Sequence, residues 1–142
     1  MPVSLDLRTP LRAHAEWIAR LRERVYEDQP IDPEMIQRDD VCRLGRWLIE
    51  QAPALRHLPE FEAARVAHAA VHTEAARLAR LMEAGHLHEA KAAIENNGRV
   101  RRQSAAMVRT FTRLGRRIAL AQAAKTADAG SGRTTTRTPP ED

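Results

Sequence analysis

The stretch PEFEAARVAHAAVHTEAARLARLM, residues 59–82, decides the fold. Its apolar side chains recur at alternating spacings of three and four residues, which places them on one face of an α-helix. Pro59 suits the first turn of such a helix, and Gly85 is a natural stop beyond its end. The stripe consists of Phe61, Ala64, His68, Val71, Ala75, Leu78 and Met82. A helix with one apolar face packs best against other helices, so the stretch predicts a helical bundle.

Two stretches upstream carry the same periodicity. The first begins at Pro10, which suits a first helical turn, and should end by residue 29 because Pro30 disfavours helix just before it. The second covers residues 40–52 and should be closed by Pro53. Between them, Asp32 followed by proline favours a short extra turn.

A fourth apolar stripe begins near Leu87 and continues to about residue 121. The triplet at residues 96–98, Asn-Asn-Gly, favours turn conformations, and the sequence leaves open whether the helix continues through it. With 43% apolar but only 4% aromatic residues, the composition also favours helix over sheet. We therefore predict an all-α fold, a four-helix bundle with a short extra turn between the first and second helices.

The 142 residues are enough for one core but not for two full domains. We assign residues 1–125 to a single helical bundle. Residues 126–142 are rich in Gly, Ser, Thr, Arg and Pro, and we expect them to form a disordered tail. No stretch approaches the roughly 18 uncharged apolar residues of a membrane span, and no export signal is evident, so we expect a cytoplasmic protein.

Two histidines stand out on the stripe of residues 59–82. His68 and His72 are four residues apart, so their rings project from one helical face about one turn apart. That separation lets two imidazoles reach a single metal ion. In a chain with six histidines such a pair also arises by chance, so the spacing alone is a weak signal.

His14 and the single cysteine, Cys42, strengthen the case for a metal. His14 lies on the apolar stripe of the first predicted helix, where it is either a hydrogen-bonded core histidine or a ligand. Cys42 begins the second helix and is either a small buried hydrophobe or a ligand, since one cysteine allows no internal disulfide. Together with His68 and His72, these residues form a Cys-His₃ set that suits one tetrahedral zinc ion, Zn²⁺, per chain.

The same residues carry a resemblance to a known family. The segments HAEW (residues 14–17), CRLGRWL (42–48) and HAAVH (68–72) resemble, in order and spacing, the signature blocks of the chemoreceptor zinc-binding (CZB) family. The resemblance extends loosely over residues 5–121. It implies that His14, Cys42, His68 and His72 are the zinc ligands.

Three further residues in these segments have packing roles. We expect the indoles of Trp17 and Trp47 to line the bundle around the metal and keep water away from it. Gly45, one turn after Cys42, should allow a neighbouring helix to approach closely. The other histidines, His57, His86 and His88, should be exposed to solvent.

The resemblance also implies a function. CZB domains are associated with signal transduction and chemotaxis, as zinc-responsive and hypochlorite-responsive modules of bacterial chemoreceptors and diguanylate cyclases. Cys42, held as a thiolate by zinc, is then the redox-reactive group. This chain carries neither a receptor signalling helix nor a cyclase domain, so its output should pass through such a partner or through its own homodimer. Four protein ligands leave no open position on the metal, and the sequence has no phosphate-binding loop or nucleophile elbow, so we expect no enzyme activity.

A rival interpretation rests on charge. The chain has 23 basic and 19 acidic residues, and its arginines gather in the last predicted helix. They are Arg99, Arg101, Arg102, Arg109, Arg113, Arg116 and Arg117. Such a row could bind nucleic acid or an anionic surface, but no aromatic residues interleave with it to stack on bases, and a solvated outer face explains it more simply. A third, simpler role is that of a zinc reservoir.

Overall fold

The structure is a computed structural model that describes residues 6–135, with side chains described to residue 128. All of its regular structure in that range is helical. The helices are α1 (Arg8–Tyr26), α2 (Pro33–Gln37), α3 (Arg43–Leu55), α4 (Pro59–Glu83), α5 (Leu87–Ile94) and α6 (Arg99–Thr135). The predicted all-α bundle is thus confirmed, with α2 as the short extra turn.

The stretch that predicts the fold forms the central helix, α4. Pro59 is its first residue and Leu58 its extended N-cap, while Gly85 just beyond its end has a φ of +82°. Alanines at positions 64, 75 and 79 are fully buried, so neighbouring helices approach this face closely. His68 and His72 lie on the same buried face.

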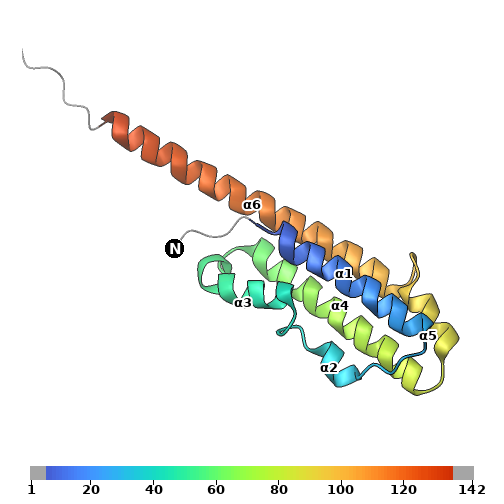
Figure 1. The fold of residues 1–142 in the computed structure, drawn as a ribbon. Coiled ribbons are helices and arrows are strands. Elements are labelled where there is room, and N and C mark those ends of the chain that lie inside the picture. Colours follow the sequence, from blue (N-terminus) through green and yellow to red (C-terminus); the bar gives the residue numbers. More distant parts are fainter. Residues whose placement is uncertain (1–5, 136–142) are drawn as a thin grey trace, which may run out of the picture.

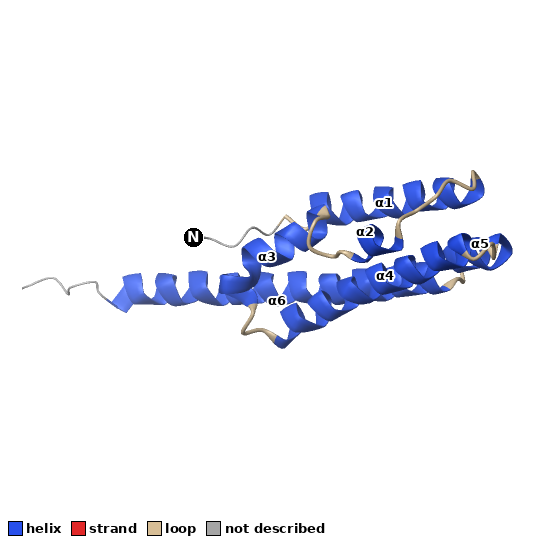
Figure 2. Ribbon diagram, turned by 90° about the horizontal axis from the view of Figure 1, so that it is seen from below, coloured by secondary structure: helices blue, strands red, loops and turns tan. Residues whose placement is uncertain are grey.

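Figures 1 and 2 show α1, α4 and α6 running along one another as the long members of the bundle. The most extensive contact is between α4 and α6. The fourth position is filled by two helices in series: α3, which packs mainly on α1, and α2, which packs on α4. This arrangement brings the start of α3 and the middle of α4 to the same level of the bundle. No helix in residues 6–135 is long and apolar enough to cross a membrane.

The fourth apolar stripe is divided into two helices, α5 and α6, at the Asn-Asn-Gly triplet, where the sequence left the continuity of the helix open. Helix α5 ends at Ile94, and α6 begins at Arg99, directly after the Asn-Asn-Gly triplet. A Cβ on Gly98 would lie only 2.2 Å from the carbonyl oxygen of Ala92, so this close turn requires glycine. Asp32 likewise caps α2 as expected, its side chain accepting a hydrogen bond from the amide of Glu34 at 3.0 Å.

Three boundaries differ from the predictions. Helix α3 starts at Arg43 rather than near residue 40, because the preceding loop folds back over the helix, as described below. The same helix continues through Pro53 to Leu55. Proline at position 53 removes only the backbone hydrogen bond to the carbonyl of Ile49. Ile49 is 59% exposed, so water can reach that carbonyl.

Helix α6 also runs further than expected. It continues to Thr135, past residue 126, where the sequence predicts a disordered tail to begin. The alanine-rich segment of residues 119–124 has high helix propensity and carries the helix beyond the end of the other helices (Figure 1). Residues 136–142 of the predicted tail lie outside the described residues.

Candidate metal centre

Cys42 is the N-cap of α3. Its backbone is extended, and its Sγ accepts a hydrogen bond from the amide of Gly45 at 3.3 Å, as an N-cap side chain does. A Cβ on Gly45 would lie 1.7 Å from the carbonyl oxygen of Asp39. The close approach predicted for Gly45 is real, but it is made by the loop before α3 rather than by another helix. Because Gly45 has no Cβ, the loop that presents the sulfur can lie against the first turn of α3.

His68 and His72 present their rings to this sulfur from α4. Their side chains are almost fully buried, with exposures of 1% and 3%. Cys42 Sγ lies 3.2 Å from His68 Nε2 and 3.6 Å from His72 Nε2, and the two Nε2 atoms are 3.2 Å apart. Three potential ligand atoms thus form a closed triangle inside the bundle.

The triangle has the dimensions of one face of a zinc tetrahedron. With a Zn–S bond of about 2.3 Å and Zn–N bonds of about 2.0 to 2.1 Å, tetrahedral angles give S···N and N···N edges of about 3.6 and 3.3 Å. The distances around Cys42, His68 and His72 agree with those edges within a few tenths of an ångström. Thiolate and imidazole donors also favour zinc over magnesium or calcium. The residues present therefore fit the metal.

The ring of His72 is held in the orientation that a ligand needs. Its Nδ1 donates a hydrogen bond to the backbone carbonyl of Ile36, in α2, at 2.8 Å. With the proton on Nδ1, the lone pair of Nε2 points toward Cys42 and His68. A carbonyl partner of this kind typically orients metal-binding histidines and raises their basicity.

Burial keeps these groups neutral at physiological pH. Desolvation, with the nearby histidines His72 and His14, lowers the pKa of His68 to about 3. Desolvation also lowers the pKa of His72, against the hydrogen bond to Ile36, and raises the pKa of the Cys42 thiol. Neutral imidazoles are the form that binds a metal, whereas the thiol must lose its proton, so binding should release one proton from Cys42.

His14 lies beside the triangle but is not part of it. Its side chain is 6% exposed, and its Nε2 lies 2.9 Å from Ser104 Oγ, a hydrogen bond that joins α1 to α6. Desolvation and the nearby His72 lower its pKa to about 4. The structure thus brings together Cys42, His68 and His72, while the fourth predicted ligand is hydrogen-bonded elsewhere.

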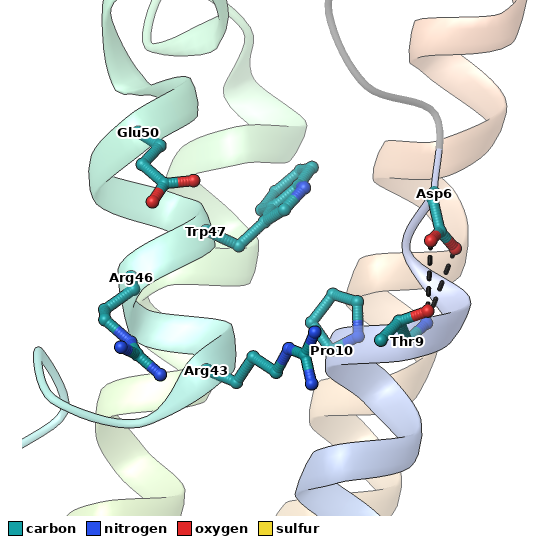
Figure 3. A pocket seen from close by; sticks show the side chains of 7 residues that line it. All are labelled: Asp6, Thr9, Pro10, Arg43, Arg46, Trp47 and Glu50. Atoms are coloured by element: carbon teal, nitrogen blue, oxygen red, sulfur yellow. Dashed lines mark hydrogen bonds between the residues drawn. The ribbon is translucent and has the colours of Figure 1, made fainter.

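The two tryptophans have different positions. Trp17 packs between His14 and His72, with ring centroids 5.7 and 4.9 Å away, and so covers the site on the α1 side. Trp47 instead packs edge-on against Phe111 of α6, at 6.3 Å. It lines a separate cavity of about 420 Å³ between α3 and the start of α1 (Figure 3). Only Trp17 therefore lies against the candidate ligands.

The other three histidines and the arginines of α6 lie apart from Cys42, His68 and His72. His57, His86 and His88 are exposed, as predicted. On α6, Arg117 forms an ion pair with Glu60 at 4.0 Å. Phe111, the aromatic residue nearest to these arginines in the sequence, is buried in the core. The arginine-rich helix thus uses its apolar stripe for packing and exposes Arg102, Arg109, Arg113 and Arg116 to solvent.

Two contacts of the site were not predicted from the sequence. The carbonyl of Ile36 accepts a hydrogen bond from His72. Because every residue has a backbone carbonyl, the amino-acid sequence does not indicate which one accepts this bond. Ser104, the partner of His14, did carry a signal, because it is a polar residue on the apolar stripe of the last helix.

Fold and site together define a helical bundle with a buried thiolate and imidazole metal centre. Residues 14–79 match the family model described as the chemoreceptor zinc-binding domain. This part of the chain, which contains all four predicted ligands, is a CZB domain and belongs to that family of zinc-binding sensory domains. Neither a curated protein nor a solved structure matches the chain.

Proposed function

We propose that this protein is a zinc-dependent sensory or regulatory domain in which Cys42, His68, His72 and His14 hold one zinc ion. The observation that carries the proposal is the triangle of Sγ and two Nε2 atoms with the edges of a zinc tetrahedron. No ordinary hydrogen-bond network needs all three of these atoms in mutual contact.

His14 is the fourth ligand in this proposal. It lines the same cavity as Cys42 and His72, and its ring is buried among them. To bind the metal, its Nε2 would exchange the hydrogen bond to Ser104 for a coordinate bond. Zinc would then join α1 to α3 and α4, so occupancy would stabilise the bundle and its loss would loosen α1.

Cys42 is the group through which an oxidant would act. Bound zinc keeps the thiol deprotonated, and the thiolate is the nucleophilic form. Hypochlorous acid oxidises such a sulfur to a sulfenic acid and is itself reduced to chloride: RS⁻ + HOCl → RSOH + Cl⁻. The neutral sulfenic acid is a poorer ligand than the thiolate, so the signal would be release of the metal.

The output would be a change in the surface around α1 and α3, read by a chemoreceptor, a diguanylate cyclase or a second copy of the chain. A homodimer is the simplest such assembly. We place the protein in the cytoplasm, where its single cysteine stays reduced.

The test is oxidant-triggered release from the zinc-loaded chain. One equivalent of hypochlorite should release about one zinc per chain, measured with a chromogenic chelator, and a sulfenic-acid trap should label Cys42. Oligomeric state, measured by light scattering, should change at the same time. Zinc retained after oxidation of Cys42 would contradict the proposal, and release without any change in assembly or in a partner's binding would instead indicate a reservoir.

A further inference from the structure

A cavity of about 230 Å³ opens directly onto the metal centre. It lies between α1 and the start of α3, and Cys42, His72 and His14 form part of its wall. Trp17 and other apolar side chains form much of the rest. A cavity of this size holds a small molecule of a few non-hydrogen atoms beside the ligand sulfur.

The charged residues around this cavity all have one sign. They are Arg20 from α1 and Arg43 and Arg46 from the first turn of α3, and the lining includes no acidic residue. Among the described residues, none of the three forms an ion pair or a side-chain hydrogen bond, and all are exposed. Figure 3 shows Arg43 extending from α3 toward Pro10 of α1, across the gap between the two helices. Three arginines without an ion pair therefore line this cavity.

The backbone adds to this potential. Helix α3 begins at Arg43 with no acidic residue in its first turn, so the positive end of its dipole is not neutralised locally. The amide of Gly45 already points at the Cys42 sulfur. Helix dipole and guanidinium groups thus act in the same direction at the same place.

The opposite side of the metal centre has a different character. A second cavity, of about 180 Å³, contains His68 in its wall together with Asp39, Asp40 and Arg65. Acidic residues thus line that cavity, whereas the lining of the cavity on the α1 side has arginines as its only charged residues.

From this geometry we infer that the cavity bounded by Arg20, Arg43 and Arg46 is a binding site for small anions, which it concentrates beside the Cys42 sulfur. The ligands are inorganic anions and small carboxylates. The inference deepens the proposed function, because it specifies the charge of the reagents that reach the metal centre most readily. Local potentials of this kind raise encounter rates by at least about tenfold.

Alkylation of Cys42, the only cysteine, tests the inference directly. Iodoacetate and iodoacetamide react by the same step, in which the thiolate sulfur displaces iodide and forms a thioether, but only iodoacetate is anionic. The full chain would be alkylated as purified and after chelator treatment, and the rate constants followed by mass spectrometry. Their ratio, normalised to the ratio for glutathione, reports the local potential at the sulfur.

A matched pair of variants isolates the three arginines. Arg20→Gln, Arg43→Gln and Arg46→Gln in one chain should lower the iodoacetate to iodoacetamide ratio about tenfold. Arg102→Gln, Arg109→Gln and Arg113→Gln in another chain remove the same charge from the outer face of α6 and should leave the ratio unchanged. In the wild type, raising the salt from about 20 to 500 mM should slow iodoacetate and not iodoacetamide.

An equal ratio in all three proteins, or an equal fall in both variants, would overturn the anion site. So would a wild-type rate for iodoacetate that does not respond to salt, a result that depends on no variant. Zinc content of the same preparations keeps the two proposals apart. Zinc present with an unchanged ratio would remove only the anion site, whereas absent zinc with an arginine-dependent ratio would remove only the zinc sensor.

Discussion

The two sides of the metal centre are built differently. On the side of α3 and α4, three ligand atoms lie within 3.6 Å of one another, and Cys42 and His72 are held by hydrogen bonds to the backbone of Gly45 and Ile36. On the side of α1 and α6, His14 is just as buried but is hydrogen-bonded to Ser104. One side is already arranged for a metal, and the other offers a ligand that must first change partner.

This difference suggests how the domain could respond to zinc. In the proposed function, the preformed set of three ligands would capture the metal, and recruitment of His14 would then couple occupancy to the contact between α1 and α6. A switch needs an element with two alternative partners, and we propose that His14 is this element.

The largest effect should follow from removing a ligand of the preformed side. Cys42→Ala or His72→Ala should weaken zinc binding at least about 100-fold, since losing even the orienting partner of a ligand costs about 10- to 100-fold. The zinc content of the purified chain, measured by elemental analysis without tags or chelators, should fall from about one per chain in the wild type to near zero in either variant. His57→Ala, which removes an exposed histidine, is the control and should retain the metal; equal zinc in all of these proteins would refute the assignment.

Next in size should be a change in the loop that presents Cys42. Gly45→Ala places a Cβ against the carbonyl of Asp39, so we expect the free energy of unfolding to fall by about 2 to 3 kcal/mol. Gly115→Ala in α6 is the matched control, because its Cβ meets only Leu7 Cδ1 at 3.5 Å. That substitution should instead stabilise by up to about 1 kcal/mol, through helix propensity. Urea denaturation measures both, and a Gly45→Ala chain as stable as the wild type would show that the loop is not fixed as described.

A smaller effect should appear when the metal-free protein is acidified. His14 and His68 have pKa values lowered to about 4 and about 3 by burial, whereas in the unfolded chain they titrate near 6.5. Below about pH 6.5 the unfolded chain therefore binds protons that the folded chain does not, and stability falls as the pH drops toward 4. Urea titrations between pH 7.5 and 5.5 should show this decline. A free energy of unfolding that stays constant over that range would mean that these rings are not buried.

The smallest effect should come from the competing partner of His14. Ser104→Ala removes a hydrogen bond worth about 1 kcal/mol, so zinc binding should tighten about fivefold while the stoichiometry stays at one. In a His14→Ala background the same change should have no effect on zinc affinity, which a double-mutant cycle measures. If Ser104→Ala acts equally with and without His14, the exchange of partners is wrong.

Much of this architecture follows from the sequence, because helix periodicity and the spacing of His68 and His72 are local properties. One turn of helix fixes the separation of two rings whatever surrounds them. The position of Cys42 at the start of a helix is similarly local. The relation of His14 to these residues depends instead on how α1 packs against α6. The apolar stripes of the two helices carry His14 and Ser104 separately, and they do not show whether His14 binds Ser104 or a metal.

Helix ends were harder to predict for the same reason. The continuation of α3 through Pro53 depends on the exposure of Ile49, which only the packed structure reveals. The length of α6 depends on a balance between alanine-rich helix propensity and the absence of a partner to pack against. The three arginines around the cavity were also missed, because they come from two helices and share no motif.

The central claim is that one sulfur and three imidazoles bind the zinc. X-ray absorption at the zinc edge of the metal-loaded chain tests it most directly. We predict one sulfur at about 2.3 Å and three nitrogens at about 2.0 to 2.1 Å, with one imidazole lost in His14→Ala. A spectrum without sulfur, or one unchanged by His14→Ala, would contradict the account.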